Sequence, residues 1–283
     1  MTKPSGVKYV SAAHSHWTHP VGTLGTIVAE ARIRAGALEL QRRALEHACS
    51  DVPSGASLRA VLRQSTVGLL AEVKRRSPSK GAIAEGLDAV EQAHAYAAGG
   101  AAAVSILTEP VHFGGSIVDF VAVRSSVMLP TLKKDFHVAP VQLVEARALG
   151  ASAALLIARA LSPDQLAQMM RAGQSLGLEL LVEVRDEAEL ERALAAGATM
   201  IGVNNRDLET LIIDPETSDR LIPMIPSHVV AIAESGVHTR ADVERYAAVG
   251  ADAVLVGSSL SASPDPTAAT RAIVGVPRRH RAG

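Results

Sequence analysis

Eight short apolar runs alternate with segments of helical periodicity along most of the chain, and this rhythm restricts the folds open to it. The segments between the runs are rich in Ala, Glu, Arg and Leu at helical spacing. Strictly alternating strands and helices imply a parallel sheet, and eight such units in about 210 residues predict a (β/α)8 TIM barrel. The alternative is an open doubly wound sheet, but no GxGxxG motif follows the first run. The predicted strands are residues 68–74, 102–107, 130–134, 153–158, 178–184, 199–205, 228–235 and 252–258.

Residues at the predicted helix ends support this division. Asp186 and Thr239 stand where N-caps belong, and several helical segments end in Gly followed by Ala, which suits a left-handed C-terminal cap. We expect one domain over residues 1–283. It would comprise a partly helical N-terminal extension (1–57), the barrel core (58–262), and a last helix with a basic tail (263–283).

The charge balance argues against several classes of partner. Lys and Arg total 28 against 29 Asp and Glu, a net charge of -1, so we expect no nucleic-acid partner, and the basic end at residues 277–283 is too short to alter this. No segment has the apolar length of a membrane span or the core of a signal peptide. Cys49 is the only cysteine, which fits a reducing compartment. We therefore expect a cytoplasmic protein without a membrane partner.

Two charged residues end the first predicted strand. Glu72 and Lys74 are two positions apart, so both side chains point to one face. Because an unpaired buried charge is costly, that face must open onto a solvated or ligand-filled cavity. In a barrel, the C-terminal mouth gives inward polar residues this access. Polar residues that end later strands would surround the same mouth: Lys134, Glu183, Asn204, Asn205, Glu234 and Ser235.

The last two predicted strands end in small residues. Gly236 follows the seventh strand, and Gly257 and Ser258 follow the eighth. The loops after these strands, with the start of a short helix, form the usual phosphate site of a TIM barrel. Glycine allows a ligand to approach the backbone closely. The sequence therefore predicts a phosphate-binding end at these positions.

A set of motifs lies between residues 58 and 260: AEVKRRSPSKG, SILTEPVHFGGS, LKKDF, ALLIA, LVEV, IGVNNRDL, AESGV and VLVGSSL. In their order and spacing, these motifs are similar to those of the indole-3-glycerol phosphate synthase family of tryptophan biosynthesis. EVKRRSPSKG and KKDF together are highly specific for this family.

The resemblance implies a reaction without cofactor or metal. The substrate would be a small phosphorylated molecule, 1-(2-carboxyphenylamino)-1-deoxyribulose 5-phosphate. Ring closure, decarboxylation and dehydration would convert it to indole-3-glycerol phosphate. Other enzymes of the tryptophan pathway are candidate partners.

The resemblance also implies catalytic roles. Lys134 would be the general acid that protonates the ribulose carbonyl, and Glu183 a base or proton relay. Glu72 would orient and tune the lysines. Lys74 would bind the carboxylate or phosphate side of the substrate and supply a proton in dehydration. The residues expected at the ribulose hydroxyls are Asn204, Glu234 and Ser235.

Further positions would bind substrate. The resemblance implies a phosphate end lined by Arg206, Gly236, Gly257 and Ser258, and it includes Ser77 of the SPSKG motif. The expected apolar slot for the aromatic ring comprises Pro78, Phe113, Phe136 and Leu155.

Elementary chemistry fits these residue types. Addition to a carbonyl needs a proton donor at the developing alkoxide, and loss of hydroxide needs another. A lysine near other cations has a lowered pKa, and we expect this effect to make the lysines acids near neutral pH. The neighbouring carboxylates would offset the repulsion between the two lysine ammoniums at the mouth of the barrel.

Some features depart from the family pattern. His112 stands where an aromatic residue is common, and the segment before the first strand lacks the usual aromatic. These differences leave open a second copy that serves a specialised pathway. A catalytically silent barrel that binds a phosphorylated ligand is another alternative. A metal hydrolase barrel would use His14, His16 and His19, but these precede any predicted strand, and we expect no metal site.

Overall fold

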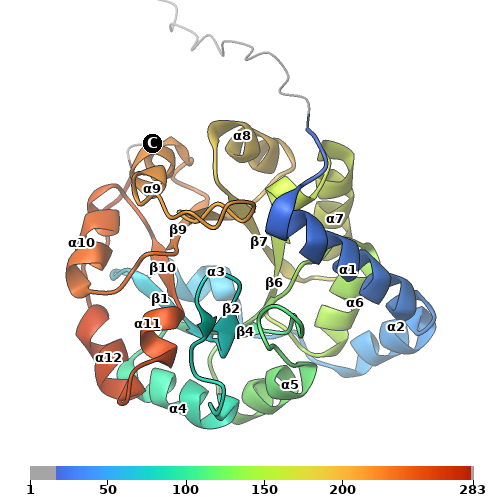
Figure 1. Cartoon of the computed structure of the whole chain (residues 1–283), viewed down its shortest axis with the longest axis horizontal. Coiled ribbons are helices and arrows are strands. Elements are labelled where there is room, and N and C mark those ends of the chain that lie inside the picture. Colours follow the sequence, from blue (N-terminus) through green and yellow to red (C-terminus); the bar gives the residue numbers. More distant parts are fainter. Residues whose placement is uncertain (1–16, 282–283) are drawn as a thin grey trace, which may run out of the picture.

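Eight parallel strands close into a barrel in the computed structural model, which describes residues 17–281. Around the barrel the strands follow the order β1, β10, β9, β8, β7, β6, β5, β4, and β4 returns to β1 (Figure 1). The predicted (β/α)8 barrel is therefore confirmed. Its strands are β1 (Gly68–Val73), β4 (Ala103–Leu107), β5 (Thr131–Lys134), β6 (Ala153–Ile157), β7 (Glu179–Val184), β8 (Met200–Asn204), β9 (Val230–Glu234) and β10 (Ala253–Val256).

Helices surround the barrel, and their ends match the expected signals. The side chains of Asp186 and Thr239 accept hydrogen bonds from the N–H groups of Glu189 and Asp242. The four helix-terminating glycines that precede an alanine have positive φ: Gly100, Gly150, Gly197 and Gly250. The outer helices are α4 (Ala89–Gly99), α5 (Ile117–Ser126), α6 (Pro140–Ala148), α7 (Pro163–Ser175), α8 (Glu187–Ala195), α9 (Glu216–Leu221), α10 (Arg240–Ala248) and α12 (Pro266–Ile273).

Short elements lie near the two ends of the barrel. Helix α3 (Leu58–Val61) precedes β1, and Leu58 and Leu62 are fully buried at the N-terminal end. At the opposite end, β2 (Arg76–Ser77) and β3 (Gly81–Ala82) form a hairpin across the mouth, which the sequence did not predict (Figure 1). The other short helices are α11 (Ser258–Ser261), η1 (Ala158–Ala160) and η2 (Ile222–Met224).

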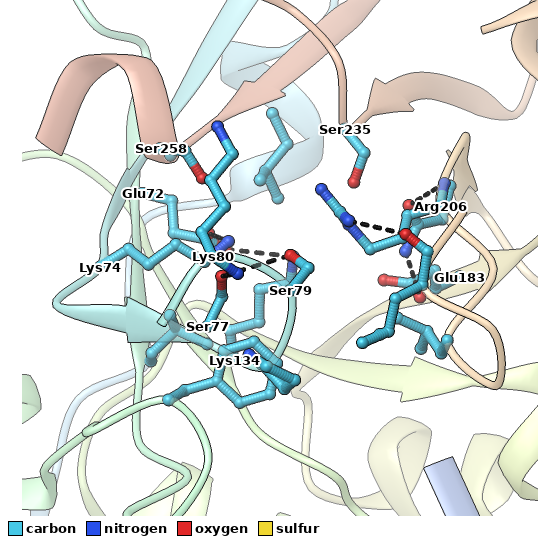
Figure 2. A pocket seen from close by; sticks show the side chains of 18 of the residues that line it. Glu72, Lys74, Ser77, Ser79, Lys80, Lys134, Glu183, Arg206, Ser235 and Ser258 are labelled. Carbon is cyan, nitrogen blue, oxygen red and sulfur yellow. Dashed lines mark hydrogen bonds and ion pairs between the residues drawn. The ribbon is translucent and has the colours of Figure 1, made fainter. Parts of the chain in front are cut away.

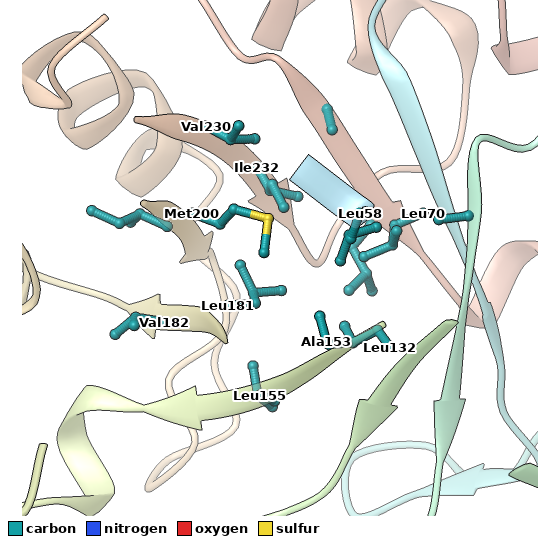
Figure 3. Packing of buried hydrophobic residues seen from close by; sticks show 14 of the residues in the cluster. Leu58, Leu70, Leu132, Ala153, Leu155, Leu181, Val182, Met200, Val230 and Ile232 are labelled. Atoms are coloured by element: carbon teal, nitrogen blue, oxygen red, sulfur yellow. The ribbon is translucent and has the colours of Figure 1, made fainter. Parts of the chain in front are cut away.

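Apolar side chains fill the barrel below the mouth. Leu132, Leu181 and Ile232 come from three different strands and lie near Leu58 of α3 (Figure 3). The strands are buried almost throughout because helices cover the outer face and these side chains fill the inner one. The barrel interior is therefore a packed core, and only its upper layer is free for chemistry.

The N-terminal extension contains two helices where the sequence predicted partly helical structure. Helix α1 (Gly22–Glu39) packs on α6 and η1, and α2 (Arg42–Asp51) packs on α6. Leu24, Ile27 and Val28 of α1 are buried against the barrel. The extension is thus docked at the mouth side of the barrel (Figure 1). Within residues 17–281, no helix combines the length and apolarity that crossing a membrane requires.

The basic C-terminal tail is folded against the barrel. Arg278 and Arg281 form ion pairs with Asp252 at 2.6 and 2.9 Å, and all three side chains are largely buried. Asp252 also accepts a hydrogen bond from the N–H of Ala231. The backbone of the tail pairs with the segment before β1, where Val67 N–H donates to Val276 O. The tail's charges therefore stabilise the fold.

Replacing Asp252 with Ala should destabilise the protein strongly. The change leaves two buried guanidinium groups without a carboxylate, and breaking a buried pair in this way costs about 3–5 kcal/mol. Glu187→Ala removes a carboxylate from an ion pair with Arg220 that is about half exposed, and it should cost less than about 1 kcal/mol. Urea unfolding of both variants checks this, and equal losses would contradict the assignment.

Candidate active site

A buried carboxylate joins two lysines at the centre of the mouth. Glu72 Oε1 lies 2.8 Å from Lys74 Nζ, and Glu72 Oε2 lies 3.1 Å from Lys134 Nζ (Figure 2). Lys134 Nζ also lies 3.3 Å from Glu234 Oε2. Glu72 and Glu234 are each only 1% exposed. The expected convergence of the two lysines with carboxylates is therefore present.

Strand alternation places these charges directly above the apolar core. Each charged residue follows an interior apolar residue by two positions and so points the same way. The pairs are Leu70 and Glu72, Leu132 and Lys134, Leu181 and Glu183, and Ile232 and Glu234. Because side chains in a strand point to the same face at every second residue, a charged layer lies directly above an apolar layer.

Two glycines make room for the carboxylates. A Cβ on Gly202 would lie 1.9 Å from Glu234 Oε1, and a Cβ on Gly257 would lie 2.5 Å from Glu72 Oε1. Neither position tolerates a side chain without movement of the neighbouring carboxylate. Gly257, predicted only as part of the phosphate end, therefore also shapes the charged centre.

The expectation of a lowered lysine pKa is wrong for Lys134. Burial alone would lower its pKa, but Glu72, Glu234 and Glu183 raise it above the ordinary value. The two lysines correspondingly lower the pKa of Glu72 to about 2 against the effect of its burial. The carboxylates outweigh the mutual repulsion of the cations, so Lys134 enters any reaction as a charged ammonium.

Glu234 differs from Glu72 in its protonation. Burial raises the pKa of Glu234 to about 8; Lys134 opposes the rise and Glu183 adds to it. Its Oε1 atom is buried and has no hydrogen-bond partner among residues 17–281. Glu234 can therefore hold or release a proton near neutral pH.

Asn204 orients the remaining carboxylate. Its Nδ2 atom donates to Glu183 Oε1 at 2.9 Å, and its Oδ1 atom accepts from the backbone N–H of Arg206. Asn205 was expected at the same mouth but instead donates to Ser235 O and Tyr246 Oη. It braces the β8 and β9 loops, and only Asn204 reaches the cavity.

One cavity contains nearly all of the predicted site. The exceptions are Asn205 and Glu234; neither lines the space, although Glu234 contacts Lys134. The predicted residues that line it are Glu72, Lys74, Ser77, Pro78, Phe113, Lys134, Phe136, Leu155, Glu183, Asn204, Arg206, Ser235, Gly236, Gly257 and Ser258.

The cavity has an apolar end. The rings of Phe113 and Phe136 lie 6.0 Å apart at a tilt of 37°, beside Pro78 and Leu155. Lys74 Nζ lies 5.9 Å from the centre of the Phe113 ring, within reach of a cation–π attraction. These side chains form an apolar surface for a flat aromatic group, and the Lys74 ammonium lies beside it.

The other end is polar and has small side chains. Ser235 and Gly236 both have positive φ, at 67° and 82°, and turn the chain sharply after β9. Arg206 lines the same cavity; its Nη1 atom donates to Leu211 O at 2.9 Å, and within residues 17–281 it has no carboxylate partner. This end suits an anion, and phosphate binding there stays a prediction.

Sequence reasoning missed several contributors. Leu24 and Ile27 of α1 line the cavity, as does Lys80 in the hairpin turn. Asp135, next to Lys134, accepts hydrogen bonds from Arg34 of α1 and from Thr108. Lys80 belongs to the SPSKG motif, so a charged residue at the mouth could have been predicted there from the sequence. The α1 residues follow only from tertiary packing.

Helix α1 is fastened to several mouth loops. Glu209 accepts hydrogen bonds from Arg159 and from the N–H of Val21, at 2.7 and 2.9 Å. On the other side, His112 Nε2 lies 2.8 Å from Glu30 Oε2. His112, which departs from the family pattern, therefore connects α1 to the loop after β4.

The His112 contact brings together a possible set of metal ligands. Glu30, Glu109 and His112 converge, but Glu109 already accepts three backbone N–H groups and lies 3.6 Å from Arg34. We therefore assign the trio a fastening role. Of the histidines considered for a hydrolase, His14 and His16 lie outside the described residues, and His19 packs against Trp17.

Comparison with known proteins identifies close relatives. The sequence model described as "Indole-3-glycerol phosphate synthase" matches residues 24–273. A protein of that description from Rhodococcus jostii (strain RHA1) is 48% identical over 231 residues, covering 82% of this chain and 86% of its own length. One from Mycobacterium leprae (strain Br4923) is 46% identical over 257 residues, covering 90% and 94%.

Solved structures share the fold at low identity. A 3-hexulose-6-phosphate synthase from Salmonella typhimurium is similar with a TM-score of 0.59 and 16% identity, covering 73% of this chain and 96% of its own. A thiamine phosphate pyrophosphorylase from Pyrococcus furiosus gives a TM-score of 0.57 at 16% identity, covering 77% and 96%. At this identity the likeness supports the barrel alone.

Gly202→Ala should displace Glu234 from Lys134. The new methyl group would overlap Glu234 Oε1, and overpacking of this kind costs about 1–3 kcal/mol. Gly86→Ala is the matched control, because a Cβ there meets nothing within 4 Å. Crystal structures and melting temperatures of both variants test this. An unmoved Glu234 in Gly202→Ala would show that the close approach is not a constraint.

Proposed function

Because this chain belongs to the indole-3-glycerol phosphate synthase family, we propose that the residues of its cavity divide the steps of that reaction among themselves. The reaction is a carboxy-lyase reaction of tryptophan biosynthesis. It closes the ring of 1-(2-carboxyphenylamino)-1-deoxyribulose 5-phosphate, then releases carbon dioxide and water to give indole-3-glycerol phosphate. The substrate carries an aromatic carboxylate at one end and a phosphate at the other.

Lys134 is the acid for ring closure. The ring carbon that bears the carboxylate attacks the ribulose carbonyl, and the oxygen takes a proton from the Lys134 ammonium as it becomes a hydroxyl. The single observation that carries this assignment is the contact of Lys134 with both Glu72 and Glu234. Glu72, which is ionised near neutral pH, keeps the ammonium charged, and both contacts hold it in place, so it stabilises the developing alkoxide and donates to it.

Dehydration needs an acid and a base. After carbon dioxide leaves, the new hydroxyl departs as water while a proton is lost from the neighbouring ribulose carbon. Glu183, held by Asn204, is suited to accept that proton, since no lysine pairs with it directly among the described residues. Lys74 is suited to protonate the leaving hydroxyl. Glu234 is suited to pass protons near neutral pH.

The cavity ends match the ends of the substrate. Phe113, Phe136, Pro78 and Leu155 hold the aromatic ring, and Lys74 at the ring's edge meets its carboxylate. The phosphate lies at the opposite end. There it meets Arg206, Ser235, Gly236, Gly257 and Ser258, with Ser77 lining the wall between.

The same reasoning extends to the cellular setting. Tryptophan biosynthesis on soluble intermediates fits a cytoplasmic protein, and other enzymes of the pathway are candidate partners.

The alternative of a catalytically silent barrel is less well supported. A barrel that only binds a ligand would need no proton donors and base around one cavity, whereas here Lys74, Lys134 and Glu183 all line it. That arrangement favours catalysis.

Replacing the two lysines separately tests the division of labour. Lys134→Met keeps the bulk of the stem but removes the proton and charge, so kcat should fall about 10²–10⁴-fold with a modest change in KM. Lys74→Met should also raise KM, because it removes a contact to the carboxylate. The measurement is the fluorescence of indole-3-glycerol phosphate formed by purified protein in EDTA.

The outcome that contradicts the assignment is specific. If Lys134→Met kept more than about a tenth of wild-type kcat, a loss far below that of a general acid, Lys74 would be the better candidate. Because the proposed steps use side chains alone, wild-type turnover should persist in EDTA. A strict requirement for added metal would overturn the mechanism.

A further inference from the structure

The cationic side chains of the cavity fall into two groups. Lys74 and Lys134 are bound to Glu72, and Lys134 also to Glu234, so carboxylates already balance their charges. Lys80 and Arg206 line the same cavity, and within residues 17–281 neither forms an ion pair with a carboxylate, although Arg206 Nη1 donates a hydrogen bond to Leu211 O at 2.9 Å. No described carboxylate therefore balances the charges of the second group, which can meet an anionic ligand.

Lys80 stands at the turn of the hairpin that crosses the mouth. Its backbone N–H donates to Ser77 Oγ at 3.2 Å, and Ser77 pairs with Gly81 across the hairpin. Gly81 has a φ of +64°, which lets the chain reverse there. These contacts set the direction in which the Lys80 side chain leaves the turn.

The base of the hairpin is fixed to the barrel. Arg75 O accepts hydrogen bonds from the N–H groups of Ile83 and Ala84, at 2.8 and 3.0 Å. The Arg75 guanidinium binds Asp119 of α5 and Leu87 O. A turn held in this way can present a side chain to a ligand with little further loss of backbone entropy.

The side chain of Lys80 extends toward the small-residue end of the cavity. Figure 2 shows it running toward Ser258, and both residues line the space. Lys74 lies instead beside Phe113, at the aromatic end. The two lysines of the EVKRRSPSKG motif therefore differ, because Lys74 is bound to Glu72 beside Phe113 while Lys80 extends toward Ser258.

We propose that Lys80 is a further phosphate-binding residue, which contacts the substrate phosphate opposite Arg206. The inference rests on the proposed function and adds a residue to its phosphate end. A phosphate dianion carries two charges, and Arg206 alone would balance only one of them. Lys80 supplies the second cation from a different loop.

The exposure of Lys80 determines its expected effect. The side chain is exposed at the rim of the mouth, so solvent and salt screen its attraction to the phosphate. It lies outside the group of lysines and carboxylates that handles protons. Its loss should therefore weaken binding and leave the chemical steps intact.

The test compares Lys80→Ala with Arg76→Ala in the full-length protein. Arg76 is an exposed cation of the same hairpin that does not line the cavity, so its removal changes the net charge equally. Lys80→Ala should raise KM about three- to tenfold at unchanged kcat, as expected for a partly screened ion pair. Arg76→Ala should leave both constants unchanged, and Lys80→Arg should restore KM.

Inorganic phosphate separates the phosphate from the carboxylate of the substrate. Its dissociation constant, measured by calorimetry without turnover, should rise by a similar factor in Lys80→Ala, and the dependence of KM on salt should flatten. Unchanged phosphate binding would overturn the proposal, even with a raised KM, because the lysine would then meet the carboxylate. If Arg76→Ala changed KM and phosphate binding as much as Lys80→Ala does, the effect would come from the net charge of the hairpin and not from a contact with Lys80. That result would also overturn the proposal.

These measurements distinguish failure of the proposed function from failure of the Lys80 proposal. Wild-type protein without turnover would contradict the proposed function, while phosphate binding would still report on Lys80. A fall in kcat in Lys80→Ala at unchanged KM would contradict the binding role alone.

Discussion

The buried Glu72 carboxylate, shared by two lysine ammoniums, is the interaction on which the site depends. Without it, Lys74 and Lys134 would repel each other, and burial would favour the neutral form of Lys134. With it, Lys134 is held charged above a packed apolar layer, and Glu72 stays ionised far below neutral pH. The second carboxylate, Glu234, has the opposite tendency and can carry a proton near neutrality. One mouth thus contains a fixed acid and a proton-exchanging neighbour.

The sequence predicted the barrel and most of the residues that line its cavity, for identifiable reasons. The alternation of apolar runs and helical segments specifies parallel strands, and the period of two within a strand places Glu72 and Lys74 on one face. Every parallel strand then delivers its last inward residue to the same end. The separations of Lys134, Glu183 and Glu234 along the chain therefore did not matter, because topology brings the strand ends together. Motif resemblance supplied the roles that spacing could not.

Other features depend on tertiary packing that no local pattern records. The direction of the Lys134 pKa shift depends on how many carboxylates lie near its ammonium. The prediction considered only the neighbouring cations, which lower a lysine pKa, and so it had the wrong direction. Helix α1 reaches the cavity through Leu24 and Ile27 because Arg34 and Glu30 meet residues of the β4 and β5 loops. The hairpin after β1 is stabilised by Arg75, whose partners Asp119 and Leu87 come later in the chain. No local pattern in the basic tail predicted that Arg278 and Arg281 would be buried in ion pairs with Asp252.

The charge state of Lys134 is the central claim, and its titration tests this claim most directly. The chain has six lysines, so NMR of protein with ¹³C-labelled lysine side chains gives few signals, and Lys134→Arg assigns the one of interest. The account predicts that the Lys134 signal remains that of an ammonium at pH 10.5, where an ordinary lysine is about half deprotonated. Glu72→Gln should move its midpoint downward. A midpoint for wild-type Lys134 below 10.5 would contradict the account, since crowding by cations would then outweigh the carboxylates.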